Sequence, residues 1–369
     1  MRLREFIGAF EKRYPPDWAM PDDKVGLLCG DLNRAVEKII LALDATESVI
    51  REAVDGGYDL LITHHSPAKR SFNTVLANDR ITGKVYYAVQ HDLAIYTAHT
   101  NLDFAPDGVS VVLAEILGVK FEKYLRAKCN ESLYKLAVFV PKEHFEKFRK
   151  SFLDIGVGHI GNYSHCSFSG EGEGSFLPMD GAKPFIGEVG KLETVEELRF
   201  ETIVPKHLLA EALEAIRTLH PYEEPAFDIY PLENDAIKGG FGVVGAFNAT
   251  TKLFDIIELC RRKLPTESVR YIGIPERYVR KAAVVGGSGD HVLDDIISEK
   301  VDILITGDIS HSSALALNDA QMAVVLPGHF ATEWIILPHV RDVITEILES
   351  YSVKGDVTIA EAENSLFKA

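Results

Sequence analysis

The chain has 369 residues, of which 46% are hydrophobic and 25% charged, and this composition predicts a packed globular protein with more than one domain. Its 39 Lys and Arg residues stand against 55 Asp and Glu residues, a net charge of −16. Nucleic-acid binding is therefore not expected, because non-specific affinity comes mainly from Lys and Arg contacts to phosphate. Four widely spaced cysteines, no signal-peptide pattern and no membrane-length apolar run predict a cytoplasmic protein that does not bind membranes.

Short apolar runs recur in both halves of the chain, and each is followed by a segment of helical character. The runs cover residues 38–43, 59–63 and 93–97 in the first half and 282–285, 301–306 and 322–326 in the second. Continuous apolar runs of this length are typical of strands that are buried on both faces. With helices expected at about 47–56 and 291–299, the alternation predicts a layered α/β domain.

The middle of the chain follows another pattern. It predicts a strand at 134–140, a helix at 142–155, a Gly- and Ser-rich strand after Cys166, a strand at 198–204, a helix at 206–219 and a strand at 225–231. The order β-α-β-β-α-β is that of a ferredoxin-like module. The predicted architecture is a discontinuous α/β domain, residues 1–125 and 236–369, which carries an inserted ferredoxin-like α+β domain at 126–235.

Histidines and carboxylates gather where four of the predicted strands end. They are His64 and His65, then His99 and Asp103, then Asp308 and His311, then His329 and Glu333. In open α/β sheets, ligands bind beyond the carboxyl ends of the strands. Because adjacent strand residues point to opposite faces, we expect the strand to break into a loop where the histidine pair begins.

These residue types indicate a metal site. Imidazole nitrogen and carboxylate oxygen bind zinc, iron or manganese, and three or four histidines with two carboxylates exceed the needs of one tetrahedral ion. They suit two divalent metal ions that share a bridging ligand, an arrangement used in metal-assisted hydrolysis. A structural role stays open for each residue alone, since a His and a Glu at i and i+4, as at His329 and Glu333, often form a surface pair. Their joint placement favours the metal site.

Two weaker features have two readings each. The Gly286-Gly-Ser-Gly stretch could cradle a phosphate, but a plain turn between strand and helix is favoured. The His220-Pro-Tyr-Glu-Glu-Pro stretch could bind a metal or a ligand, but a rigid turn is favoured. His291 looks like an ordinary surface histidine.

The chain resembles the Nif-three-like (YbgI/YqfO-type) dinuclear metal-centre family over nearly its whole length. The matching stretches are Gly26-Leu-Leu-Cys-Gly, Leu43-Asp-Ala-Thr, Ile62-Thr-His-His-Ser-Pro, His99-Thr-Asn-Leu-Asp, Thr306-Gly-Asp-Ile-Ser-His and Gly328-His-Phe-Ala-Thr-Glu. The middle, with His220-Pro-Tyr-Glu-Glu-Pro-Ala-Phe-Asp, resembles the PII/CutA-like insert of the longer bacterial members.

The resemblance implies a specific ligand set. Two metal ions would be held by His64, His65, Asp103, His329 and Glu333. His99 and His311 would line the same cavity and shuttle protons as catalytic residues. Where many relatives carry a second histidine after His311, this chain has Ser312. The family also implies a homohexamer whose metal sites face an inner chamber that the inserts cap.

The function implied by the resemblance is enzymatic but loosely defined. Family members often carry the label of a GTP cyclohydrolase 1 type 2 homologue, so we expect a metal-dependent hydrolase whose substrate is a nucleotide-like or phosphorylated small molecule. The alternative is a non-catalytic metal-binding regulatory assembly whose insert senses a ligand. A DNA-binding ring is disfavoured by the net charge of −16.

Overall fold

The structure is a computed structural model that describes residues 1–68, 71–129, 132–161, 163–234, 237–266 and 268–363. The chain forms two compact units, Met1–Lys128 with Ile237–Ala369, and Cys129–Ala236. The boundary expected between residues 235 and 236 lies outside the described residues. In the described part, none of the helices combines the length and the apolar character that crossing a bilayer requires.

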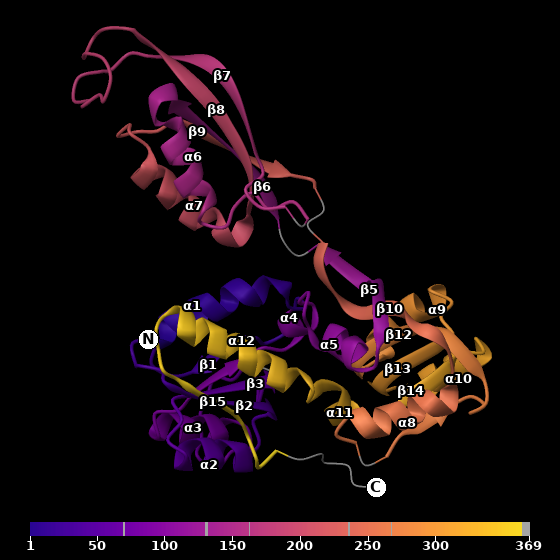
Figure 1. The fold of residues 1–369 in the computed structure, drawn as a ribbon. Coiled ribbons are helices and arrows are strands. Elements are labelled where there is room, and N and C mark those ends of the chain that lie inside the picture. Colours follow the sequence, from indigo (N-terminus) through magenta and orange to yellow (C-terminus); the bar gives the residue numbers. More distant parts are fainter. Residues whose placement is uncertain (69–70, 130–131, 162, 235–236, 267, 364–369) are drawn as a thin grey trace. The chain divides into compact units, whose positions relative to one another are not determined.

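The first unit contains a five-stranded sheet in the order β1-β4-β3-β2-β15 (Figure 1). The strands are β1 (Gly26–Cys29), β2 (Lys38–Asp44), β3 (Leu60–His65), β4 (Ala94–Thr97) and β15 (Asp356–Ile359). All neighbours are parallel except β1, which runs antiparallel to β4 at one edge. Helices α1 (Leu3–Arg13) and α12 (Ile336–Ser350) cover one face, and α2 (Glu47–Asp55) and α3 (Thr82–Gln90) cover the other.

Helices on both faces explain why β2 is apolar along nearly its whole length. Ile39 and Leu41 pack into the core beneath α1 and α12, while Ile40 and Ala42 pack beneath α2 and α3. Every second residue of a strand faces the same way, so a polar residue on either face would be buried. Thr46 follows β2 and is the N-cap of α2. Its side-chain hydroxyl accepts a hydrogen bond from the Val49 backbone N–H.

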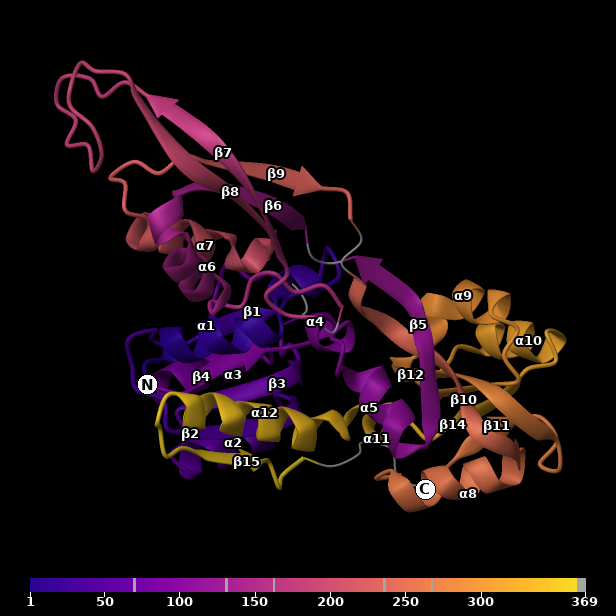
Figure 2. The same ribbon diagram turned by 45° about the horizontal axis from the view of Figure 1, so that its top comes forward.

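A second, six-stranded sheet of the first unit has the order β11-β14-β13-β12-β10-β5 (Figure 2). Its strands are β5 (Val119–Cys129), β10 (Ile237–Lys252), β11 (Arg270–Ile272), β12 (Tyr278–Ser288), β13 (Ile303–Asp308) and β14 (Ala323–Leu326). Helices α5 (Val109–Ile116) and α8 (Leu253–Lys263) pack on one face, and α9 (Leu293–Ser298) and α10 (His311–Asp319) on the other. The six apolar runs of the sequence thus belong to two sheets, three runs to each.

Short elements complete the first unit where these sheets approach each other. They are the helices α4 (Thr100–Asp103) and α11 (His329–Glu333) and the 3-10 turns η1 (Pro16–Trp18) and η3 (Asp290–Val292). Helix α4 follows β4 of the first sheet, and α11 follows β14 of the second. The chain therefore brings the ends of two sheets, not of one, to the predicted site.

The second unit is a four-stranded antiparallel sheet in the order β7-β8-β6-β9. Its elements are β6 (Leu133–Pro141), η2 (Lys142–His144), α6 (Phe145–Leu153), β7 (Ser167–Phe176), β8 (Glu193–Pro205), α7 (Lys206–Leu219) and β9 (Phe227–Leu232). Both helices pack on one face of the sheet, over a core that includes Val138, Phe152, Phe200 and Ile216. The opposite face carries no helix among the described residues.

Candidate metal centre

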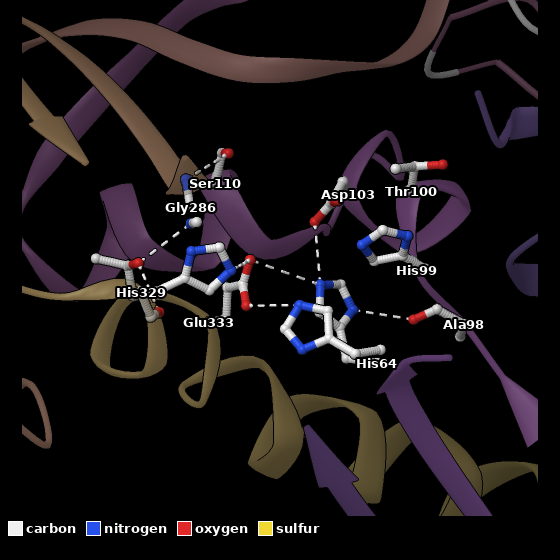
Figure 3. A network of polar contacts seen from close by, with 12 residues as sticks. His64, Ala98, His99, Thr100, Asp103, Ser110, Gly286, His329 and Glu333 are labelled. Carbon is white, nitrogen blue, oxygen red and sulfur yellow. Dashed lines mark hydrogen bonds and ion pairs between the residues drawn. The ribbon is translucent and has the colours of Figure 1, made fainter. Parts of the chain in front are cut away.

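Three segments of the chain deliver the candidate ligands to one place (Figure 3). His64 and His65 are the last residues of β3, Asp103 is the last residue of α4, and His329 and Glu333 begin and end the short helix α11. The expected break before the histidine pair is wrong, because β3 continues through His65. Pairing to β4 ends at Thr63, so β2 alone holds this end of the strand, and the two imidazole centroids lie 5.0 Å apart.

His64 presents a free nitrogen to two buried carboxylates. Its Nδ1 lies 2.9 Å from the Ala98 carbonyl oxygen, which requires an N–H there and leaves a lone pair on Nε2. Nε2 is buried 3.7 Å from Asp103 Oδ1 and 3.9 Å from Glu333 Oε1, and it has no hydrogen-bond partner among the described residues. Burial lowers the pKa of His64 to about 3, so the ring is neutral.

His65 and His329 face Glu333 from opposite sides, and a carboxylate orients each ring. Nδ1 of His65 donates to Asp44 at 3.0 Å, and Nδ1 of His329 donates to Asp308 at 2.7 Å. Their Nε2 atoms lie 3.2 Å and 3.1 Å from the two oxygens of Glu333. Metal-binding histidines are commonly oriented in this way by a carboxylate on the other ring nitrogen.

His65, His329 and Glu333 shift one another's pKa values. Burial opposes the charged form of His65, but the hydrogen bonds of Asp44 and Glu333 outweigh it and raise its pKa to about 10. Asp308 and Glu333 likewise raise the pKa of His329 to about 10. Burial opposes ionisation of Glu333, yet its two histidine partners lower its pKa. Positive charge beside Glu333 is thus favoured, and a divalent cation supplies it when protons leave the rings.

His99 and Asp103 form the other end of the cluster. Nδ1 of His99 donates to Asp23 at 2.8 Å, and this bond and the nearby carboxylates raise the His99 pKa against the effect of burial. Burial raises the pKa of Asp103 to about 7. Asp23 also accepts hydrogen bonds from the backbone and side chain of Thr100, so this loop carboxylate fixes the position of His99.

The donor atoms fit a divalent metal. Two groups have all their candidate ligand atoms within 4.8 Å of one another: His64, His65 and His99, and His65, His329 and Glu333. His64 Nε2 is buried and has no hydrogen-bond partner in the described part of the chain, and the described contact of Glu333 Oε2 is with His65 Nε2 at 3.2 Å. Buried polar atoms without partners are costly, and both are good ligands for zinc, iron or manganese. The cluster can therefore hold a metal ion.

Two glycine positions shape the space around Glu333. Gly287 has a φ of +64°, and a Cβ there would lie 2.2 Å from Glu333 Oε1. The backbone N–H groups of Gly286 and Gly287 donate to the hydroxyls of Ser110 and Thr332, both at 3.1 Å. These two N–H groups are therefore engaged within the protein, and the stretch serves close packing beside the cluster.

A cavity of about 590 Å³ opens beside the cluster. Its lining includes His65, His99, Asp103, His329 and Glu333 from the predicted set, together with Asp22, Asp23, Lys24, Phe241, Ser288 and His291. Such a volume accommodates a small-molecule ligand. With four carboxylates and one lysine in its described lining, the cavity favours a metal ion or a ligand that a metal ion helps to hold.

The structure places most of the predicted residues together, but not His311. Asp308 ends β13, Ser310 caps α10, and His311 is the first residue of that helix, with its side chain exposed and outside the cavity lining. The expectation that His311 lines the cavity is therefore wrong for this chain. His291 is exposed, as the sequence suggested, and it also borders the cavity because η3 follows the Gly-rich turn directly.

Asp23 and Asp44 were not predicted as site residues. Asp44 is the last residue of β2, which is parallel to β3. Its position at a strand end could therefore have identified it as a residue of the site. Asp23 lies in a loop more than seventy residues from His99, and no pattern in the sequence connects the two.

The fold and the cluster define a class: a mixed α/β protein with a buried histidine–carboxylate group that can bind a metal ion. Comparison with known proteins makes this specific. The chain belongs to the DUF34/NIF3 (NGG1p interacting factor 3) family, whose model matches residues 1–365.

Relatives and solved structures match this protein over nearly the whole chain. A Bacillus subtilis protein named "GTP cyclohydrolase 1 type 2 homolog" is 39% identical over 367 residues, which is 99% of this chain and 97% of that protein. The crystal structure of a Bacillus cereus protein related to NIF3 superposes with a TM-score of 0.91 at 35% identity, covering 100% of this chain and 99% of that one. Staphylococcus aureus SA1388 gives a TM-score of 0.74 at 25% identity, with coverage of 100% and 99%.

Proposed function

We propose that the cluster is a dinuclear metal centre and that the protein is a metal-dependent hydrolase for a nucleotide-like or phosphorylated small molecule. The proposed ligands are His64, His65, Asp103, His329 and Glu333. The observation that carries the proposal is the buried Nε2 of His64, which points its lone pair toward Asp103 and Glu333 without a hydrogen bond in the described structure. A lone pair facing two carboxylates is repulsive unless a cation lies between them.

The residues of the cavity have separate tasks in this proposal. Metal ions, when bound, supply Lewis-acid activation of water and of the bond to be cleaved. Asp44 and Asp308 hold His65 and His329 in the orientation that a ligand needs. His99, held by Asp23 and facing the cavity, accepts and returns a proton.

The substrate class rests on two supports. Relatives of this chain are named for GTP cyclohydrolase 1 type 2, a name that points to a nucleotide. Lys24 is the lysine in the described cavity lining, and it can pair with a phosphate group of the substrate.

Metal content tests the centre directly. Elemental analysis of protein purified without a metal-affinity tag should give two zinc, iron or manganese ions per chain. Glu333→Gln keeps the shape of the side chain but removes the charge, and it should lose at least one ion. His311→Ala, an exposed histidine outside the cavity, is the matched control and should keep both. Wild-type metal content in a folded Glu333→Gln variant would refute the ligand set.

Activity is tested after the metal. The metal-loaded protein is assayed against GTP, other nucleotides and phosphoesters, and chelator treatment should abolish any turnover while readdition restores it. Absence of turnover across this panel, with two bound ions, would overturn the hydrolase and leave a non-catalytic metal-binding assembly. The cavity in the second unit, described below, is the observation that favours that alternative.

The assembly and the insert belong to the same proposal. We infer that residues 126–235 form a ferredoxin-like insert, which the order β6-α6-β7-β8-α7-β9 and the antiparallel sheet support. We also propose a homohexamer, supported by the exposed apolar side chains of Leu76, Tyr86 and Val89 in and before α3. Light scattering after gel filtration tests the hexamer, and a monomer at micromolar concentration would exclude it.

A further inference from the structure

The second unit contains a cavity of about 570 Å³ on the face of its sheet that carries no helix in the described structure. The cavity lies over β7 and β8 and is closed by the segment after β7 and by the turn before β9. Its lining includes Phe139, Phe176, Phe185, Tyr222, Gly172, Gly174, Glu197 and Arg199. The volume is that of a small-molecule pocket, and the walls are mainly apolar with four aromatic side chains.

A buried carboxylate lies in this cavity without a cation. Glu197 is only 9% exposed, and among the described residues it forms no ion pair. Arg199, the nearby cation of the lining, is engaged with Glu201 at 2.8 Å and lies over the Phe139 ring. A buried charge that has lost its water needs a partner of opposite charge, because desolvation costs several kcal/mol.

Gly174 makes room for this carboxylate. A Cβ at Gly174 would lie 2.2 Å from Glu197 Oε2. Gly172 pairs directly with Glu197 across the two strands, and a Cβ there would find its nearest neighbour only at 4.0 Å. Gly174 therefore accommodates the carboxylate itself, and Gly172 leaves open space beside it, although glycine weakens a strand.

Tyr222 provides a second polar group. Its hydroxyl oxygen is buried and faces the Glu197 carboxylate, with no other hydrogen-bond partner among the residues that the structure describes. Burial and the Glu197 carboxylate both raise the pKa of Tyr222, so the hydroxyl stays protonated. His220 fixes this turn, because its Nε2 lies 2.9 Å from the Phe139 carbonyl and its Nδ1 accepts the Tyr222 backbone N–H at 3.0 Å.

This arrangement does not favour a metal ion as the occupant. Both ring nitrogens of His220 are engaged, so the histidine of this turn is not a ligand. Clusters of three closely spaced metal-ligand atoms occur, within the described residues, only at the centre in the first unit. Metal sites need several such atoms at once, whereas a buried carboxylate beside aromatic rings suits a cation with an apolar body. Glu171, Glu173, Glu223 and Glu224 also belong to the lining and add negative charge that favours a cation.

We propose that this cavity binds a small organic ammonium ion with an apolar or aromatic body. Glu197 pairs with the ammonium group. The rings of Phe176, Phe185 and Tyr222 surround the cation and its apolar body. The open space at Gly172 lets the ligand lie close to the strand. Aromatic faces attract cations and repel anions, so charge and shape select the same ligand class. The proposal does not depend on the metal centre.

The test uses the full-length protein and 2-phenylethylammonium as the probe, with 2-phenylethanol as the neutral probe of matched shape. A probe of this size is expected to bind with a Kd of about 1 mM, measured by calorimetry or saturation-transfer NMR. The alcohol should bind about tenfold more weakly, because it lacks the charge-assisted contact. Equal binding of the two probes, or no binding of the ammonium well above this concentration, would overturn the proposal.

Two pairs of variants locate the binding. Glu197→Gln should weaken the ammonium about tenfold and leave the alcohol unchanged. Glu196→Gln is the control, since its exposed side chain lies on the opposite face of β8. Gly172→Ala narrows this open space and should weaken both probes, whereas Gly170→Ala, on the same face but outside the cavity lining, should not.

Each variant is checked for folding by circular dichroism. If Glu197→Gln fails to fold, the glycine pair still tests the location, because neither added Cβ meets an atom closer than 3.9 Å. Binding that is unaffected by Gly172→Ala would place the probe elsewhere and refute the assignment.

Discussion

Substitution of Gly287 by alanine should remove metal from the centre without touching a ligand. The residue has a φ of +64°, and the added Cβ would lie 2.2 Å from Glu333 Oε1. The carboxylate must move, and it is 95% buried beside His65 and His329, so the shift disrupts both contacts. We expect loss of at least one metal ion per chain.

Gly57 offers a matched control for the backbone strain. It has the same φ of +64°, but a Cβ there would find nothing within 4 Å. Left-handed backbone costs a non-glycine residue about 1–2 kcal/mol, so both alanine variants should lose this much stability. Gly287→Ala should lose a further amount of about 1–3 kcal/mol from overpacking. Gly57→Ala should keep its metal.

Two measurements distinguish these effects. Elemental analysis gives the metal content, and urea unfolding of metal-free protein gives the stability. Tryptophan fluorescence reports on the first unit alone, because the two tryptophans, Trp18 and Trp334, both belong to it. If Gly287→Ala retains the wild-type metal content, or unfolds with the same midpoint as Gly57→Ala, the proposed contact with Glu333 is wrong.

Three further predictions concern the first unit. Asp107 accepts hydrogen bonds from Arg13 and from His339 at 2.8 Å, which lower its pKa although burial opposes this. Because the folded-state pKa is lowered, the stabilisation is fully present above the unfolded value of about 4 and is lost as pH falls from there through the lower folded-state pKa. Asp107→Asn should therefore lower the free energy of unfolding by about 1–3 kcal/mol at pH 7. In urea unfolding, the difference between this variant and wild type should shrink as the pH falls below about 4. A difference that does not depend on pH would contradict this. His99→Ala should reduce turnover of any identified substrate by about 10²–10⁴-fold when it is compared with wild type at equal metal content, because His99 also lies in one of the candidate ligand groups. His311→Ala should change neither turnover nor metal content. Equal rates for the two variants would exclude the proton-transfer role. Removal of metal by a chelator should lower the free energy of unfolding of the first unit. The loss should be about 3 kcal/mol relative to protein that is kept with free metal at a hundred times its Kd. An unchanged urea midpoint would show that the metal does not prefer the folded state.

The local pattern of the sequence determined the elements and most of the centre. Continuous apolar runs predict β2 and β3 as strands of an α/β fold. Helices cover both faces of such a sheet, so the residues that point to either face must be apolar. His64, His65, Asp103, His329 and Glu333 were identifiable because polar residues at strand ends are placed together by parallel topology. His329 and Glu333 also share one face of α11 through their i, i+4 spacing.

Tertiary structure alone decided how these residues work. The sequence did not show that β3 and β14 belong to different sheets, because strand pairing depends on contacts between distant segments. The sequence also placed His311 in the cavity, since the turn that aims this side chain is set by packing and not by spacing. Which nitrogen of His64 stays free depends on the carbonyl of Ala98, thirty-four residues away, and that hydrogen bond exists only in the folded chain.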